Sequence, residues 1–172
     1  MQDFKIFNRK VGPKHKPLII VELGINHNGK FSIAKQIIDK AKMAGAEIIK
    51  HQTHLAEFEM SEEAKKIIPV HTKDNIFKII SDCSLSEGDE IKLKQYIQKK
   101  KMIFISTPFS REASNRLNKM KVPAFKIGSG ECNNYPLIEH ICKFNKPIIL
   151  STGMNDIPQI KKAVKIIEKN KI

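Results

Sequence analysis

The sequence of 172 residues predicts an α/β protein built on a parallel β-sheet. Short apolar runs rich in β-branched residues alternate five times with longer segments of helical periodicity. These helical segments are long enough to return the chain to the start of a parallel neighbouring strand. Polar residues follow every apolar run. Strands in series with crossover helices form a parallel sheet that the helices cover.

The first strand–helix unit covers residues 18–44. Pro17 introduces its strand, 18–23, which consists mostly of Leu, Ile and Val. Its helix, 32–44, ends before Gly45, which has the position of a helix C-cap glycine. The residues expected to share the buried face of this helix are Ile33, Ile37, Ala41 and Ala44.

The later units keep the same order, with one long connection. The second strand, 46–50, leads into a polar segment, 51–72, with a short helical candidate at 61–68, and two helices follow at 75–81 and 87–100. The remaining strands are expected at 102–106, 124–127 and 147–151, and their helices at 110–120, 136–144 and 157–170. The methionines assigned to the core are Met43, Met102 and Met120.

The strand ends decide between two architectures, an open doubly wound sheet and a (β/α)8 or TIM barrel. A barrel builds its site at the C-terminal face from several strands at once, whereas a doubly wound nucleotide fold places glycines after its first strand. Gly24 and Gly29 do not match the G-x-G-x-x-G pattern, and the sequence has no P-loop. We therefore predict a TIM barrel truncated after about five βα units at residues 17–172, preceded by an N-terminal extension or hairpin at 1–16.

The polar residues at the strand ends suit a small phosphorylated acid. Lys50 and Lys126 project from the second and fourth strands, where they would supply point charges for phosphate and carboxylate groups. Glu22 and Glu131 are carboxylates beside these cations, suited to proton transfer or to holding a sugar hydroxyl. Hydroxyl donors are expected from Thr107, Ser129 and Ser151.

Several of these residues have an alternative role. Glu22 alone is equally well explained as an ion-pair partner inside the barrel, and the Gly-Ser-Gly around Ser129 as a tight turn. Cys132 has no identifiable base partner, so we expect a small buried apolar residue. The spacing of the histidines matches no standard metal site, which favours loop histidines that only form hydrogen bonds at His27, His51 and His54.

The composition argues against some partners. The net charge of +13 comes from Lys more than from Arg, and no aromatic residues interleave the basic runs. A solvated basic surface is therefore favoured over a nucleic-acid groove. The three cysteines contain no C-x-x-C pair, and no segment approaches the roughly 18 apolar residues of a membrane helix. We expect a cytoplasmic protein that binds neither nucleic acid nor a membrane.

Five motifs resemble the N-acetylneuraminate (sialic acid) synthase family. They are Glu-Leu-Gly-Ile-Asn-His-Asn-Gly at 22–29, Lys-His-Gln-Thr-His at 50–54, Phe-Ile-Ser-Thr-Pro-Phe-Ser at 104–110, Phe-Lys-Ile-Gly-Ser-Gly-Glu-Cys-Asn-Asn-Tyr-Pro-Leu-Ile at 125–138 and Pro-Ile-Ile-Leu-Ser-Thr-Gly-Met at 147–154. The similarity runs from about residue 17 to the end of the chain. Several long motifs in the same order make the resemblance specific.

The resemblance implies an enzyme that condenses phosphoenolpyruvate with N-acetylmannosamine, or a related N-acylated amino sugar, to a sialic acid and releases phosphate. It also implies that Gln52 contacts the sugar and that Glu22 and Glu131 have acid–base or positioning roles. A divalent metal, Mn or Mg, is implied as a Lewis acid whose ligands lie outside this chain. The residues implied to hold phosphoenolpyruvate are Lys50, Thr107, Lys126, Ser129 and Ser151.

The length of the chain departs from the family pattern. The family barrel has eight strands, followed by a C-terminal antifreeze-like domain that reaches into the partner subunit of a homodimer. This chain ends after the helix of the fifth strand–helix unit, so we expect little or no synthase activity from it alone. The alternatives are a non-catalytic truncated remnant and a legionaminate- or pseudaminate-type synthase.

Overall fold

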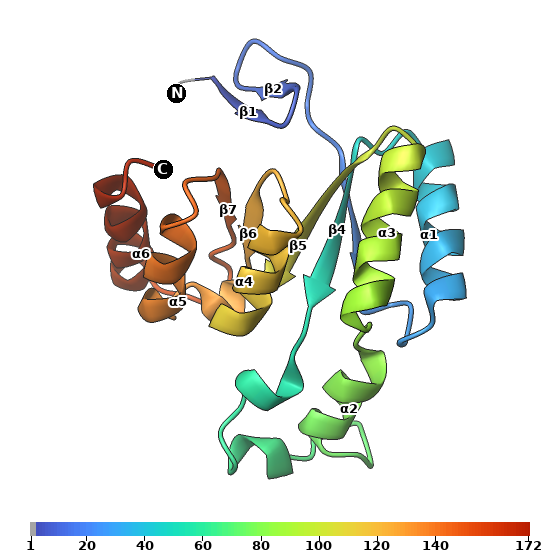
Figure 1. Cartoon of the computed structure of the whole chain (residues 1–172). Helices are drawn as coiled ribbons and strands as arrows, with labels where there is room; N and C mark the ends of the chain where they lie inside the picture. Colours follow the sequence, from blue (N-terminus) through green and yellow to red (C-terminus); the bar gives the residue numbers. More distant parts are fainter. Residues whose placement is uncertain (1–2) are drawn as a thin grey trace.

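A five-stranded parallel sheet forms the centre of the computed structural model, which describes residues 3–172 (Figure 1). Its strands follow each other in the sheet in chain order, and every neighbouring pair is parallel. A doubly wound sheet would reverse its order at a switch point, so this order confirms the barrel-type α/β class. The strands are β3 (Ile20–Gly24), β4 (Ile48–Thr53), β5 (Ile103–Pro108), β6 (Phe125–Ile127) and β7 (Ile148–Leu150). Within the described residues, β3 and β7 are the two edges, so the five strands form an open sheet and not a closed barrel.

Helices follow each strand and cover one face of the sheet (Figure 1). They are α1 (Phe31–Met43), α2 (Ile76–Cys83), α3 (Glu87–Lys99), α4 (Arg111–Lys119), α5 (Tyr135–Cys142) and α6 (Ile157–Lys169). Five of these helices begin at a polar N-cap residue whose side chain accepts a hydrogen bond from a backbone N–H of the first turn. These N-cap residues are Asn75, Ser86, Ser110, Asn134 and Asp156. The expected helix at 61–68 is instead a 3-10 turn at Ala64–Lys66, preceded by another at Ala56–Phe58.

The larger apolar core lies between the helices and the outer face of the sheet. Phe104 and Phe125 from the strands pack there with residues of the helices. The predicted face of α1 was displaced by one residue, because the residues that α1 buries are Ala34, Ile38 and Ala41. Met102 and Met120 are buried as expected, but Met43 is 79% exposed. Met43 is the last residue of α1 and lies away from the face that Ala41 buries, so its assignment to the core was wrong.

A smaller core lies on the inner face of the sheet and is covered by the N-terminal hairpin (Figure 1). The hairpin consists of β1 (Phe4–Ile6) and β2 (Arg9–Val11), an antiparallel pair within the predicted extension, whose first two residues lie outside the described part. Ile6 is 1% exposed and packs with Ile48 and its neighbours. The hairpin therefore covers the end of the inner face where the strands begin.

Candidate functional site

The inner face of the sheet carries a row of polar side chains above the small apolar core. Side chains two apart on a strand share a face, so Lys50 follows Ile48 and Thr107 follows Ile105 on the inner side. Lys126 likewise follows Ala124. The register pairs Glu22 with Lys50, which places their side chains at the same level. The strands thus bring together five predicted site residues: Glu22, Lys50, Thr107, Lys126 and Ser151.

Two sets of contacts order this row. Lys50 Nζ lies 2.5 Å from Glu22 Oε2 and donates to Thr107 Oγ1 at 3.4 Å. Lys126 Nζ donates to Ser151 Oγ at 2.6 Å. The Lys50 side chain is 5% exposed, whereas that of Glu22 is 60% exposed. This contact is the ion pair that was one of the two interpretations of Glu22, and its carboxylate stays open to solvent.

The two lysines of this row influence each other. Burial lowers the pKa of Lys126, the nearby charge of Lys50 lowers it further, and Glu22 raises it. Two partly desolvated ammonium groups therefore share one exposed carboxylate. Such a site favours a negatively charged ligand, because an added anion would offset the repulsion between the cations.

The other three predicted residues lie outside these contacts. Gln52 Oε1 is 3.3 Å from His54 Nε2, and Glu131 accepts a hydrogen bond from Asn134 Nδ2 at 2.7 Å. Ser129 follows Lys126 on a 3-10 turn, and its backbone carbonyl accepts from Asn155 Nδ2 at 2.6 Å. Among residues 3–172, no hydrogen bond or ion pair joins these three side chains to the row. Gln52 lies two residues along β4 from Lys50, and Ser129 lies three residues after Lys126, whereas Glu131 lies in a recess lined in part by Phe58, Phe109 and Pro136.

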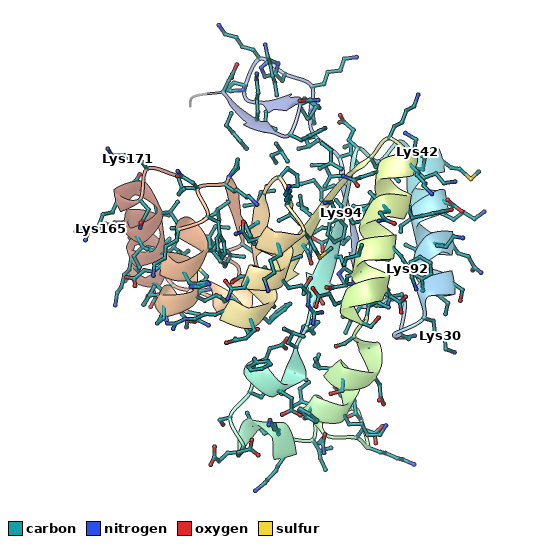
Figure 2. The ribbon with its side chains drawn as sticks, in the orientation of Figure 1. Lys30, Lys42, Lys92, Lys94, Lys165 and Lys171 are labelled. Atoms are coloured by element: carbon teal, nitrogen blue, oxygen red, sulfur yellow. The ribbon has the colours of Figure 1, made fainter. Side chains whose placement is uncertain are left out.

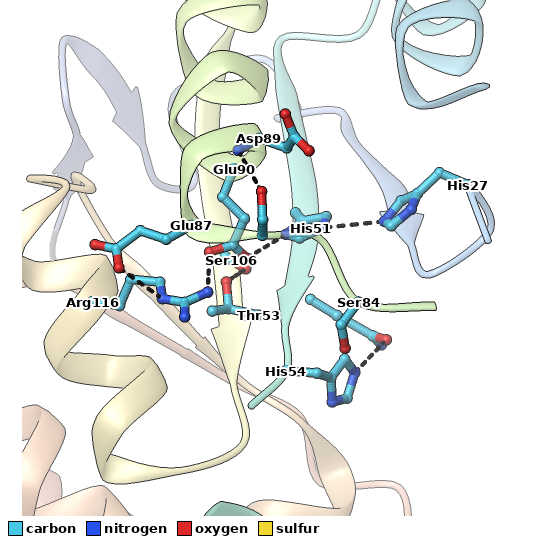
Figure 3. Close-up of polar contacts among 12 residues, drawn as sticks. His27, His51, Thr53, His54, Ser84, Glu87, Asp89, Glu90, Ser106 and Arg116 are labelled. Atoms are coloured by element: carbon cyan, nitrogen blue, oxygen red, sulfur yellow. Dashed lines mark hydrogen bonds and ion pairs between the residues drawn. The ribbon is translucent and has the colours of Figure 1, made fainter. Parts of the chain in front are cut away.

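A second polar cluster lies on the outer face of β4 (Figure 3). His27 Nε2 is 3.1 Å from His51 Nε2, and His51 Nδ1 is 3.4 Å from Glu90 Oε1. Arg116 Nη1 donates to the other Glu90 oxygen at 3.2 Å. His27, His51 and Glu90 are buried, and burial lowers the pKa of both histidines and raises that of Glu90.

Sequence reasoning missed this cluster, although two patterns indicate it. Glu90 has the spacing of a buried helix face, since the residues that α3 buries are Glu90, Leu93 and Ile97. Within β4, the side chain of His51 faces the opposite side from those of Lys50 and Gln52. The hydrogen bonds expected of the histidines are confirmed, but His51 lies in a strand and not in a loop. His54 Nδ1 also has a partner, Glu59 Oε2 at 2.8 Å.

The described residues do not form a site that fits a divalent metal. Across residues 3–172, no group of three or more His, Cys, Asp or Glu side chains is arranged to hold a metal ion. The histidines at this end of the sheet are occupied by contacts with each other and with Glu59 and Glu90. No step of the chemistry is therefore assigned to a metal held by these residues.

The basic charge is spread over the surface. In Figure 2 the labelled lysines Lys30, Lys42, Lys92, Lys165 and Lys171 lie on separate helices and loops. None of the helices in the described part is both long and apolar enough to cross a bilayer. Cys132 is 0% exposed, as expected for a small apolar residue, and burial raises the pKa of its thiol. A cavity of about 580 Å³ lies at the opposite end of the sheet from the lysine row, beside Arg9 and Phe104.

Comparison with known proteins connects this site to a family. Residues 37–172 match the model of the NeuB family. The chain is 37% identical over 160 residues to N,N'-diacetyllegionaminic acid synthase of Campylobacter jejuni, which covers 90% of this chain and 48% of the relative. It is 32% identical over 164 residues to N-acetylneuraminate-9-phosphate synthase of Mus musculus, covering 93% of this chain and 45% of the relative.

A solved structure shows the same fold. The crystal structure of N-acetylneuraminic acid (sialic acid) synthetase from Leptospira borgpetersenii, in complex with citrate, matches with a TM-score of 0.85 and 30% identity. The match covers 99% of this chain and 56% of that chain. The present chain spans about half the length of the curated relatives that it matches. The row of inward-facing lysines, hydroxyls and Glu22 thus lies in a chain that belongs to the NeuB family.

Proposed function

We propose that the inward-facing row is the phosphoenolpyruvate-binding half of a sialic acid synthase-type active site. One observation carries the proposal: Lys50 and Lys126 lie on the inner face of β4 and β6, where Lys50 Nζ donates to Thr107 Oγ1 at 3.4 Å and Lys126 Nζ donates to Ser151 Oγ at 2.6 Å. Phosphoenolpyruvate has a phosphate and a carboxylate, and a pair of lysines supplies a point charge for each. Membership of the NeuB family supports the same ligand.

The contacts suggest how the anion is shared. Lys126 and Ser151, whose side chains are 2.6 Å apart, form one set of donors, and Lys50 with Thr107 forms the other. Glu22 is suited to proton transfer or to orienting the second substrate, because its carboxylate is 60% exposed beside Lys50. An incoming anion competes with Glu22 for Lys50, so binding of the anion is linked to release of the Glu22 carboxylate from Lys50.

For the complete active site we propose condensation of phosphoenolpyruvate with an N-acylated amino sugar and release of phosphate. The relatives named for legionaminic and neuraminic acids support this substrate class without selecting one sugar. Gln52, two residues along β4 from Lys50, is proposed to contact the sugar, and Ser129 the phosphoenolpyruvate. Glu131 keeps a proposed acid–base or positioning role. A metal, a homodimer and a cytoplasmic location are proposed on the family resemblance alone, and the chain by itself is proposed to be inactive.

The binding proposal is tested by titrating the chain with phosphoenolpyruvate and following binding by calorimetry. We expect Lys126→Ala and Lys50→Ala each to weaken binding by about tenfold or more, because a hydrogen bond to a charged group contributes about 1.5–3 kcal/mol. Lys165→Ala is the matched control, since this exposed lysine lies on α6 away from the row. Equal losses for all three variants, or no binding by the unsubstituted chain, would refute the proposal.

A further inference from the structure

A chain of buried polar groups crosses the outer face of β4 from the loop after β3 to two helices (Figure 3). His27 is 0% exposed, and His51 and Glu90 are each 1% exposed. Buried polar groups lower stability unless they are paired, so a connected set of them serves to fix one arrangement of its neighbours. Here the set ends in an ion pair, because Arg116 of α4 contacts Glu90 of α3 at 3.2 Å.

The hydrogen bonds assign a proton to each ring. The backbone N–H of Gly29 donates to His27 Nδ1 at 3.2 Å, so this nitrogen accepts and carries no proton. His27 is then expected to carry its proton on Nε2, which lies 3.1 Å from His51 Nε2, and the Gly24 backbone carbonyl is a second acceptor near this ring. His51 in turn carries its proton on Nδ1, which faces Glu90 Oε1 at 3.4 Å. This last contact is longer than a good hydrogen bond, and His51 Nδ1 has no hydrogen-bond partner among the described residues.

The contact between His27 and His51 lies where the backbone hydrogen bonding between β3 and β4 is irregular. Glu22 pairs with Lys50, but Gly24 pairs with His51, so the register shifts between Glu22 and Gly24. Such a bulge redirects side chains and weakens the local ladder. The bond from His27 to His51 crosses between the same two segments on the outer face. A side-chain contact thus supplements the backbone ladder just beyond Glu22.

We propose that His27, His51 and Glu90 are positioning residues that hold Glu22 against Lys50. Lys50 and His51 are consecutive and face opposite sides of β4, so the inner contact and the outer chain share one short piece of backbone. Fixing the loop at His27 restricts the end of β3 that carries Glu22. The inference rests on the proposed function only for the role of Glu22. The coupling between the histidine contact and the Glu22–Lys50 ion pair is a property of the fold.

Nuclear magnetic resonance of ¹⁵N-labelled protein tests the proton assignment directly. At pH 7.5 we expect His51 as the Nδ1–H tautomer and His27 as the Nε2–H tautomer. The Lys50 Nζ signal reports the contact with Glu22, and Glu22→Gln defines the signal that follows its loss. We expect His51→Phe to move the Lys50 signal in the same direction. Ser114→Ala is the matched control, because Ser114 is also buried but its hydroxyl donates to the Arg111 carbonyl and not to the histidines or Glu90.

Binding of phosphoenolpyruvate gives a second readout. We expect His51→Phe to change the dissociation constant by about threefold or more in the unsubstituted chain, and by much less in a Glu22→Gln background. If His51→Phe does not fold, Glu90→Gln replaces it, since the amide keeps the size of the side chain while the ion pair with Arg116 is lost. A His51 Nε2–H tautomer, or an unchanged Lys50 signal in the folded variant, would overturn the inference. Absence of phosphoenolpyruvate binding with the expected tautomers and Lys50 signal would instead refute only the proposed function.

Discussion

The packing of the loop after β3 can be tested by comparing alanine substitutions at two glycines with left-handed backbones, Gly29 in this loop and Gly45 after α1. Gly29 has a φ of +69° and Gly45 a φ of +87°, so alanine is strained at both positions. A Cβ atom on Gly29 would lie 2.3 Å from the carbonyl oxygen of Asp82, whereas nothing lies within 4 Å of a Cβ atom on Gly45. Comparing the two alanine variants therefore separates the energetic cost of the left-handed backbone from the cost of the contact with Asp82.

The expected free-energy changes follow from these distances. A left-handed backbone costs a residue with a Cβ atom roughly 1–2 kcal/mol, and the smaller entropy of the unfolded alanine chain offsets about 0.4–1 kcal/mol. Gly45→Ala should therefore lower the free energy of unfolding by about 1 kcal/mol. Gly29→Ala must in addition displace backbone, and overpacking costs about 1–3 kcal/mol, so we expect a total loss of about 2–4 kcal/mol.

Urea unfolding followed by circular dichroism at pH 7.5 measures both variants against the unsubstituted chain. Equal m-values are required, since they show that the same surface is exposed on unfolding. Gly29→Ala should also disturb the hydrogen bond from the Gly29 N–H to His27. Losses that agree within about 0.5 kcal/mol would show that the Asp82 contact is absent in solution, and the argument for a tightly packed loop would fail.

Two further predictions concern the hairpin and the histidines. Ile6→Ala should lower the free energy of unfolding by about 2–4 kcal/mol, because Ile6 is 1% exposed. Phe7→Ala is the control and should change this free energy little, because Phe7 is 67% exposed. Similar losses for the two variants in urea unfolding would contradict the packing of the hairpin against the sheet. Burial, followed by the nearby His27, His54 and Lys50, depresses the pKa of His51, and burial depresses that of His27, so both rings take up protons less readily in the folded chain than in the unfolded chain. The unfolded rings take up protons below about pH 6.5, so stability present above that pH is lost as the pH falls. When the pH falls from 7.5 to 5.5, the free energy of unfolding of His51→Phe should decrease less than that of the unsubstituted chain. An equal decrease would count against the depressed pKa of His51. The raised pKa of Glu90 increases stability as the pH falls, but it acts in both proteins.

The strand order and the inner row could be predicted because both depend on short-range patterns. Apolar runs marked all five strands, and the residues at their ends were chemically unusual for loops. The period of two along a strand puts Lys50 on the side of Ile48 and Thr107 on the side of Ile105, but from the sequence these residues could be grouped only as polar residues at strand ends. Ser151 and Lys126 follow the same logic, although their direct contact depends on the pairing of β6 with β7.

Other features depend on packing that the sequence pattern does not encode. The buried face of α1 was displaced by one residue because helical periodicity tolerates a rotation of this size, and the angle is set by contact with the sheet. Glu131 was grouped with the lysines by proximity in sequence, but the 3-10 turn after β6 directs its carboxylate to Asn134. Glu90 was missed because a carboxylate on an apolar helix face is expected to be exposed unless a partner is known.

The segment Lys50 to His54 shows why residue identity alone cannot separate a binding role from a positioning role. All five residues are polar and consecutive, so a motif treats them as one unit. The strand divides them, because Lys50 and Gln52 face the inner side while His51 and Thr53 face the helices. A substitution at His51 would then weaken the inner contact without touching a ligand. Loss of binding is therefore insufficient to assign a residue of this segment to the ligand, and the side of the sheet that it faces must decide.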